Sequence, residues 1–151
     1  VCPTNALHPD FFGGGPESVW TPVFVPRMGY CDFSCTACGL ICPVEAIPNL
    51  ELAEKRFAVI GKAYIDTDRC IAWSDGQDCI VCEEMCPVPE KAICLEETKD
   101  VNNDGSEKAI QLPYIDRDLC IGCGICENKC PLSGEAAIRV FVSDDLVTPV
   151  I

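Results

Sequence analysis

The stretch Cys120-Ile121-Gly122-Cys123-Gly124-Ile125-Cys126-Glu127-Asn128-Lys129-Cys130-Pro131 has the spacing C-x2-C-x2-C-x3-C-P. Bacterial proteins hold cubane iron–sulfur clusters with this spacing. The three close thiolates bind one cluster, and the fourth cysteine, just before proline, binds a different one. The stretch is therefore half of a two-cluster unit, and it predicts further cysteine groups of the same kind elsewhere in the chain.

Cysteine is unusually abundant, with 14 among 151 residues. Such a density is typical of a disulfide scaffold or of a metalloprotein. Cysteines two or three residues apart rarely pair with each other, and a disulfide framework has no need of a proline after every fourth cysteine. The grouping therefore favours iron–sulfur clusters. Thirteen cysteines fall into the motif positions Cys2; Cys31, Cys35, Cys38, Cys42; Cys70, Cys79, Cys82, Cys86; and Cys120, Cys123, Cys126, Cys130.

Zinc is the alternative metal, because it also binds C-x2-C elements. Zinc does not need the third close cysteine of each group or the proline that follows the fourth cysteine. His8 is the only histidine in the chain, which excludes His-rich zinc sites and Rieske-type clusters, since the latter need two histidines. A structural zinc-binding module is therefore the second hypothesis.

The chain is strongly acidic, with a formal net charge of −13. This charge disfavours binding to nucleic acid and suits docking on a basic surface of a redox partner, although acidity alone also maintains solubility. No apolar run reaches the roughly 18 residues of a membrane span. No secretion signal is visible, and because the chain begins at Val1 and not at methionine, we expect the true N-terminus to lie upstream.

A repeated phrase precedes the last two cysteine groups. Tyr64-Ile65-Asp66-Thr67-Asp68-Arg69-Cys70 matches Tyr114-Ile115-Asp116-Arg117-Asp118-Leu119-Cys120. Each predicts a short strand, at 63–65 and at 113–115, that turns at Asp-x-Asp into a cluster loop. A second phrase follows every Cys-Pro and predicts a returning strand. Its four copies are Asn5-Ala6-Leu7, Glu45-Ala46-Ile47, Lys91-Ala92-Ile93 and Ala136-Ala137-Ile138.

The residues between the third and fourth cysteines, such as 127–129, predict a short helical turn. Two units of strand, cluster loop, short helix and strand, related by a pseudo-twofold axis, make the bacterial dicluster ferredoxin fold. We therefore expect an α+β, loop-rich protein of tandem dicluster ferredoxin-like units with short antiparallel strands. Residues 1–60 would form an incomplete first unit with an extended connector at 8–30. Residues 61–151 would form a complete dicluster domain with a hairpin insertion at 96–111.

Finer expectations follow from local patterns. The turn signal Asn102-Asn103-Asp104-Gly105 would join the hairpin arms 95–101 and 108–112. A short helix is expected at 50–55 and a strand at 57–60.

The cross-over of the fourth cysteine assigns the ligands of each cluster. We expect three complete 4Fe–4S clusters in this chain and a fourth in the intact protein. Cys42 would bind that fourth cluster, together with ligands upstream of Val1. The complete sets are Cys70, Cys79, Cys82 and Cys130 for the first cluster; Cys120, Cys123, Cys126 and Cys86 for the second; and Cys31, Cys35, Cys38 and Cys2 for the third.

Other residues near these groups are expected to have supporting roles. Cys94 lies outside every group and is expected to be a buried free thiol, with a sensor role as the alternative. Tyr64 and Tyr114 are expected in the core. Three glycines should let the backbone approach the clusters, namely Gly39, Gly122 and Gly124. Apolar loop residues should shield the clusters from water, namely Ile80, Val81, Ile121, Ile125, Leu40 and Ile41.

The spacing Cys31-x3-Cys35-x2-Cys38 also occurs in radical S-adenosylmethionine enzymes, which leave one iron free for substrate. Here a fourth cysteine is available and ferredoxin-like repeats surround the group. When cysteine holds every iron, no coordination position is open to substrate. No nucleophile–base set and no nucleotide motif is apparent. We therefore expect one-electron transfer and no catalysis by this chain itself.

Several stretches follow one pattern over nearly the whole chain: Cys2-Pro3-Thr4-Asn5-Ala6-Leu7, Trp20-Thr21-Pro22, Pro26-Arg27-Met28-Gly29-Tyr30-Cys31, Cys79-Ile80-Val81-Cys82-Glu83-Glu84-Met85-Cys86-Pro87, and Cys120 to Pro131. In this order they resemble polyferredoxins of the MauM/NapG type, four-cluster proteins associated with periplasmic nitrate reduction and related quinol-oxidising systems. The chain departs from that pattern by lacking the first cysteine triplet and an export signal.

The resemblance implies an exported protein that relays electrons between a membrane quinol dehydrogenase and a cytochrome or terminal reductase. It implies a periplasmic or membrane-associated location, with a cytoplasmic location as the alternative. A soluble ferredoxin shuttle is the alternative to a fixed subunit of a redox complex.

Overall fold

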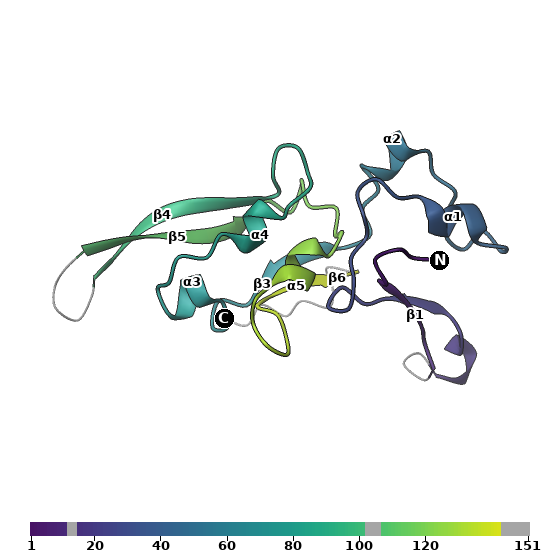
Figure 1. Ribbon diagram of the computed structural model, residues 1–151, viewed down its shortest axis with the longest axis horizontal. Coiled ribbons are helices and arrows are strands. Elements are labelled where there is room, and N and C mark those ends of the chain that lie inside the picture. The colour runs from purple at the N-terminus through teal and green to yellow at the C-terminus, as the bar shows by residue number, and fades with distance from the viewer. Residues whose placement is uncertain (12–14, 102–106, 143–151) are drawn as a thin grey trace.

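The computed structural model describes residues 1–11, 15–101 and 107–142 of the chain. Within them, short helices alternate with short antiparallel strands, and the strands form three separate two-stranded sheets. The molecule is elongated, with a long hairpin at one end and residues 1–60 at the other (Figure 1). The expected mixture of short helices and antiparallel strands is confirmed.

The middle sheet joins strands that are far apart in the sequence. Strand β3 (Lys62–Ile65) pairs antiparallel with β6 (Ile138–Phe141), with Ala63 opposite Val140. The two strands lie on either side of the last cysteine groups along the chain, so their pairing closes the second half of the molecule. The predicted strand at 63–65 and the predicted return after Cys130 are both present.

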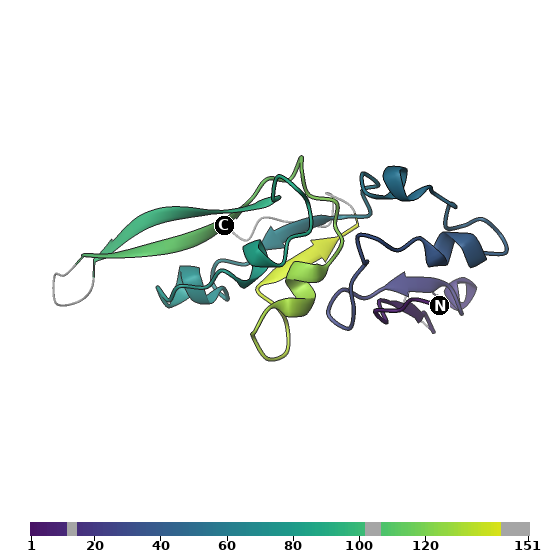
Figure 2. The same ribbon diagram turned by 45° about the horizontal axis from the view of Figure 1, so that its top comes forward.

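The second sheet is the hairpin of β4 (Ile93–Val101) and β5 (Glu107–Ile115), in register from Ile93 opposite Ile115 to Val101 opposite Glu107. It begins with the predicted return after Cys86 and extends away from the rest of the chain, as Figure 2 shows. The predicted insertion is therefore present, but its arms are continuous with the strands of the core. The expected turn residues at 102–105 lie outside the described residues.

Three helices follow in the second half: α3 (Ile71–Ser74), α4 (Val81–Glu84) and α5 (Ile125–Lys129). Helices α4 and α5 carry the third cysteine of their groups and end before the fourth, as predicted. Helix α3 was not predicted. It occupies the start of the insertion between Cys70 and Cys79, and buries Ala72 against Ile110 and Leu112 of the hairpin.

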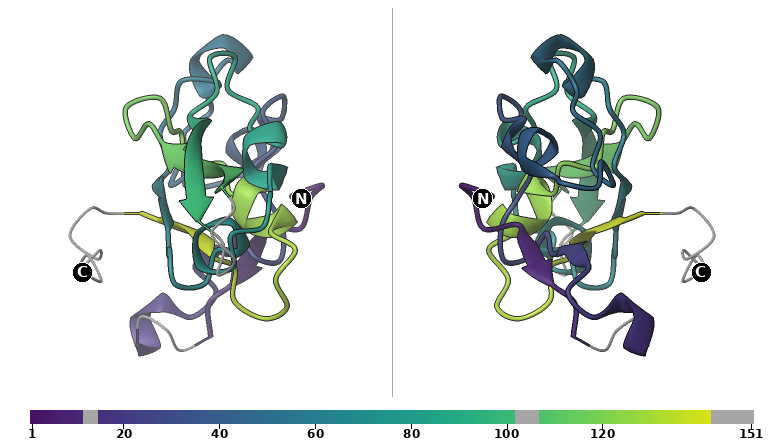
Figure 3. Two further views of the ribbon diagram at one scale, coloured as in Figure 1. Left: turned by 90° about the vertical axis from the view of Figure 1, so that its left-hand side faces the viewer. Right: turned by 90° about the vertical axis from the view of Figure 1, so that its right-hand side faces the viewer.

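Residues 1–60 contain β1 (Leu7–Pro9), the 3-10 helix η1 (Pro16–Ser18), β2 (Pro22–Phe24), α1 (Ala37–Ile41) and α2 (Leu52–Lys55). Viewed along the long axis, η1 and α2 lie on opposite sides of the molecule (Figure 3). The region 8–30 is not simply an extended connector, because β2 lies within it and pairs with β1, which begins at Leu7.

Two predicted strands of this half are wrong. No strand begins at Ile47, where Pro48 follows at once and has no N–H to donate to a ladder. Residues 57–60 leave α2 through a turn and run without regular structure. The Phe57 side chain is 82% exposed, so the apolar residues of this segment do not mark a buried strand face.

The main core is small and lies between the middle sheet, the start of β4 and the last cysteine group. Its buried members are Ala63, Ala92, Ile93, Cys120, Cys126 and Ile138. Two of the six are cysteines, so the packing of this core depends directly on the expected metal ligands.

Candidate metal centres

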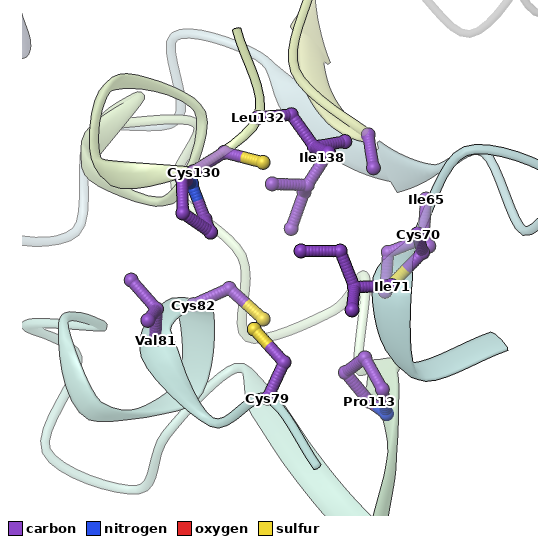
Figure 4. A pocket seen from close by; sticks show the side chains of 12 residues that line it. Ile65, Cys70, Ile71, Cys79, Val81, Cys82, Pro113, Cys130, Leu132 and Ile138 are labelled. Carbon is purple, nitrogen blue, oxygen red and sulfur yellow. The ribbon is translucent and has the colours of Figure 1, made fainter. Parts of the chain in front are cut away.

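The first candidate centre is a cavity of about 30 Å³ lined by Cys70, Cys79, Cys82 and Cys130. The sulfurs of Cys79 and Cys82 point toward one another at the start of α4, and Cys70 and Cys130 lie on opposite sides of the same hollow (Figure 4). The other lining residues are apolar. This cavity brings together the four cysteines of the first expected set.

The second candidate centre is a cavity of about 20 Å³ lined by Cys86, Cys120, Cys123 and Cys126. Its remaining lining residues are also apolar or glycine. Cys86 follows α4, whereas the other three belong to the loop and helix before Cys130. The two cavities thus exchange their fourth cysteines, which is the arrangement that the cross-over rule predicts.

The repeated Asp-x-Asp phrase has the same local structure in both places. The N–H of Cys70 donates to the carbonyl of Asp66 at 3.0 Å, and the N–H of Cys120 donates to the carbonyl of Asp116 at 3.1 Å. Each aspartate also accepts from the N–H two residues on, at 3.1 Å in Asp66 and 2.9 Å in Asp116. Aspartate forms such turns readily because its carboxylate is short. These turns place the first cysteine of each group, Cys70 or Cys120, at its cavity.

Thiols in these two cavities are crowded and dry. Burial raises the pKa of Cys126 well above its ordinary value, and the neighbouring thiols of Cys123 and Cys120 raise it further. Burial also raises the pKa of Cys123 to about 11 and that of Cys82 to about 12. Thiolates can gather in such a place only with compensating positive charge. Soft ligands of this kind fit iron–sulfur clusters, whose iron supplies that charge.

The third candidate centre lies in the first half and has larger cavities. Cys2, Cys31, Cys35 and Cys38 line a cavity of about 450 Å³. An adjoining cavity of about 330 Å³ shares three of these cysteines and also reaches Cys123 of the second centre. All four cysteines of the third expected set therefore lie around one cavity.

Backbone N–H groups donate to cysteine sulfur near the Cys-Pro positions and at the middle sheet. The distances are 3.3 Å from Ala6 to Cys2, 3.5 Å from Ile47 to Cys42, and 3.4 Å from Ala63 to Cys120. Burial raises the pKa of Cys2, but the Thr4 hydroxyl and the Ala6 N–H outweigh it, so the pKa is lowered overall. Hydrogen bonds of this kind favour thiolate ligands and help set cluster potentials.

Cys42 lines none of these three cavities. The Ile47 N–H lowers the pKa of its thiol, but the ligands expected to join it lie outside this sequence, so a fourth cluster stays a prediction. The neighbouring Leu40 and Ile41 are 68% and 62% exposed. Ile80, from the same expected set, is 42% exposed. These three side chains do not shield a cavity in this structure, and whether Leu40 and Ile41 would cover a fourth cluster stays a prediction.

The expectation that Cys94 is buried is also wrong. Ile93 is buried, and side chains alternate along a strand, so Cys94 lies on the opposite, exposed face of β4. Its sulfur is 3.8 Å from the carbonyl oxygen of Tyr114. Tyr114 occupies the paired position on β5 and is 36% exposed, so it is not a core residue either.

The three glycines singled out from the sequence are needed for contact between chain segments. A Cβ on Gly122 would lie 2.4 Å from the carbonyl oxygen of Gly61, and one on Gly39 would lie 2.4 Å from that of Pro48. Gly124 has a φ of +78° and starts α5. The close approach is thus to neighbouring backbone and side chains, which the sequence alone did not indicate.

Arg27 is a residue whose role the sequence did not reveal. Its guanidinium belongs to the first half but reaches the turn around Cys130, between α5 and the loop toward β6. Its side chain donates to the backbone carbonyls of Glu127, Cys130, Leu132 and Gly134. A lone arginine in a Gly/Pro-rich segment gives no local signal for such contacts, which span 100 to 107 residues of sequence.

Backbone hydrogen bonds also connect the second and third centres. The Cys31 N–H donates to the Cys123 carbonyl at 2.8 Å, and the Ile60 N–H donates to the Ile121 carbonyl at 3.0 Å. The first and second centres adjoin because α4, which carries Cys82, packs against α5, which carries Cys126, and Cys82 packs against the core that contains Cys126. The second centre therefore lies between the other two.

Comparison with known proteins adds a family to this geometry. A family model described as a 4Fe-4S binding domain matches residues 112–138. The ferredoxin-type protein MauM of Methylorubrum extorquens is 36% identical over 147 residues, covering 93% of this chain and 61% of its own length. Ferredoxin 7Fe of Hydrogenibacillus schlegelii is 38% identical over 71 residues, covering 47% of this chain and 67% of its own length.

The chain belongs to the ferredoxin-type iron–sulfur proteins. The ferredoxin-type protein NapG of Haemophilus influenzae is 32% identical over 95% of this chain and 50% of its own length. The resemblance to the MauM/NapG type is thus confirmed, and this ferredoxin-type chain spans about half to three fifths of the length of those relatives. No solved structure matches it. Among the described residues, no helix of this ferredoxin-type chain is long and apolar enough to cross a membrane.

Proposed function

We propose that this chain is an electron-transfer subunit that relays single electrons through three 4Fe–4S clusters. The first cluster is held by Cys70, Cys79, Cys82 and Cys130, the second by Cys86, Cys120, Cys123 and Cys126, and the third by Cys2, Cys31, Cys35 and Cys38. One observation carries the proposal: each of these three sets, drawn from two different cysteine groups, lines one cavity.

Clusters of this type supply reversible one-electron chemistry. The protein's part is to hold the thiolates, to exclude water and to keep neighbouring centres close. Asp66 and Asp116 fix the loops that carry the first cysteine of two groups. The apolar walls of the first two cavities exclude water. The packing of α4 on α5 and the Cys31–Cys123 hydrogen bond connect the centres in the order first, second, third. With four cysteines for each cluster, the chain has no substrate site of its own.

The proposal extends to a larger assembly. Relatives of this chain bear the names methylamine utilization ferredoxin-type protein and NapG, and we assign the chain to the same kind of redox system. Its partners would be a membrane quinol dehydrogenase and a cytochrome or terminal reductase, in a periplasmic or membrane-associated location. The charge of −13 suits a basic docking surface on such a partner. In the intact protein, Cys42 would take part in a fourth cluster.

A structural zinc module is the alternative with the best chemical basis. Zinc would not need the third close cysteine of each group or the proline that follows the fourth cysteine. A colourless, redox-silent protein that contains zinc would favour the alternative.

A coulometric titration of anaerobically purified protein tests the relay directly. Three one-electron clusters predict an uptake of about three electrons per chain, with interacting electron paramagnetic resonance (EPR) signals in the reduced state because neighbouring centres are close. Uptake of three electrons with fully independent signals would contradict the proposed order of centres. Reductive cleavage of S-adenosylmethionine by the reduced protein would show an enzyme and contradict the absence of a substrate site.

A further inference from the structure

The third centre differs from the other two in the charges around it. The cavities of the first and second centres have no charged residue in their lining. Those of the third centre have two, Asp32 and Lys55. Lys62 also lies near a centre, but its ammonium donates to the Cys120 carbonyl from outside the second cavity. Among these three centres, Lys55 is thus the cation that lines a cysteine-lined cavity.

Local structure holds Lys55 in this position. It is the last residue of α2, whose first turn is fixed by a capping box in which the Glu51 and Glu54 side chains accept from backbone N–H groups. The Lys55 ammonium donates to the backbone carbonyl of Asp32, in the loop between Cys31 and Cys35. The Lys55 side chain is half-buried, so its charge is only partly screened by water.

The Asp32 carboxylate makes a hydrogen bond within its own loop. It accepts from the Ser34 N–H at 2.7 Å. The Lys55 ammonium, in contrast, is held at the backbone of Asp32, next to Cys31, and Lys55 lines a cavity together with Cys31, Cys35 and Cys38. A positive charge in this place stabilises negative charge at these cysteines.

We propose that Lys55 is a positioning residue that raises the reduction potential of the cluster held by Cys2, Cys31, Cys35 and Cys38. The inference rests on the proposed function. An electron accepted there adds one negative charge and changes no ligand, so a nearby cation stabilises the reduced form more than the oxidised form. Net charge around a cluster is an established influence on its potential, and Lys55 adds one positive charge beside this centre.

The matched control is the next residue. Arg56 carries the same charge, but its guanidinium lies over the Phe33 ring, 5.2 Å from the ring centre, and the residue does not line the cavity. Removal of the Arg56 charge should therefore affect the cluster much less than removal of the Lys55 charge.

The test is a reductive EPR titration of the full chain and of the variants K55M, K55Q, K55R and R56M, with iron and sulfide content measured on each. The signal lost in Cys38→Ala identifies the third cluster. We expect K55M and K55Q to keep the wild-type iron content and to reduce this cluster at a lower potential. K55R should stay close to wild type, and R56M should shift far less than K55M.

Two results would overturn the inference. The first is an unchanged potential in a fully loaded K55Q, or an equal shift in R56M, which would show that the charge of Lys55 has no special effect. The second is loss of the third cluster from both K55M and K55Q while K55R stays loaded, which would give Lys55 a purely structural role. Wild-type protein without any iron–sulfur cluster would instead refute the proposed function itself.

Discussion

Residues 1–60 and residues 61–142 contain cysteine groups of related spacing in contrasting surroundings. In the second half, the cavities are small, apolar and bordered by the middle sheet and hairpin. In the first half, the cavities are larger, charged residues reach them, and apolar side chains such as Leu40 and Phe57 face outward. The same ligand pattern can therefore serve centres of different polarity, because the residues between the cysteines decide the environment.

The largest expected effect concerns the ligands themselves. Cys126 is buried in the main core, so Cys126→Ala should remove about four iron atoms and also destabilise the fold of the second half. Cys38→Ala should also remove about four iron atoms, but with little change in thermal stability, because Cys38 is only half-buried and lies outside the main core. Iron analysis combined with calorimetry measures both effects. Cys94→Ala is the control and should change neither. Equal destabilisation by Cys126→Ala and Cys38→Ala would remove the contrast between the halves.

Close packing in the second half predicts the next effect. Gly122→Ala places a Cβ 2.4 Å from the Gly61 carbonyl at a φ of +72° and should cost about 3 kcal/mol of unfolding free energy. Gly134→Ala has a similar φ of +77° but no atom within 4 Å, so it should cost only about 1 kcal/mol. Denaturant unfolding of the loaded protein gives the comparison. Similar costs for both variants would mean that the Gly61–Gly122 contact contributes little.

Arg27 connects the two halves, and its loss should have an intermediate effect. Arg27→Met removes the donors to the turn around Cys130 and should cost about 2 kcal/mol, since hydrogen bonds from a charged group are stronger than neutral ones. Arg27→Lys keeps the charge but cannot reach several carbonyls at once, so it should recover only part of the loss. If lysine restored full stability, the charge alone would explain the connection.

The smallest effect is expected on the exposed side of the first half. Leu40→Ser should change the unfolding free energy by less than about 0.5 kcal/mol, because the side chain is already mostly in water. The matched variant in the second half is Ile121→Ala, which removes a buried side chain from the wall of the second cavity and should cost about 2 kcal/mol or more. Chemical denaturation of this pair measures the difference. A large loss of unfolding free energy in Leu40→Ser would show that the first half is packed more tightly than the exposure of its side chains indicates.

Patterns that act over a few residues were predictable from the sequence. The cysteine spacing, the Asp66 and Asp116 turns and the strand before Cys70 depend on neighbours in the chain, and the structure contains each of them. The grouping of cysteines from different motifs around each cavity follows the cross-over rule, although the clusters themselves stay part of the proposal.

The errors arise where the structure of a residue depends on contact with another segment of the chain, which the neighbouring residues do not indicate. The apolar run at 57–60 finds no second strand, and Pro48 prevents a ladder after Ile47. Cys94 was expected inside because cysteine is commonly buried, yet alternation along β4 turns it outward. The contacts of Arg27 and Lys55 join segments distant in sequence, so nothing in their immediate neighbours indicates them.

The most direct test of the central claim is the iron and acid-labile sulfide content of anaerobically purified protein. Three complete clusters predict about twelve of each per chain. About eight of each would contradict the assignment of Cys2, Cys31, Cys35 and Cys38 to a third cluster. Zinc in place of iron would contradict the electron relay as a whole.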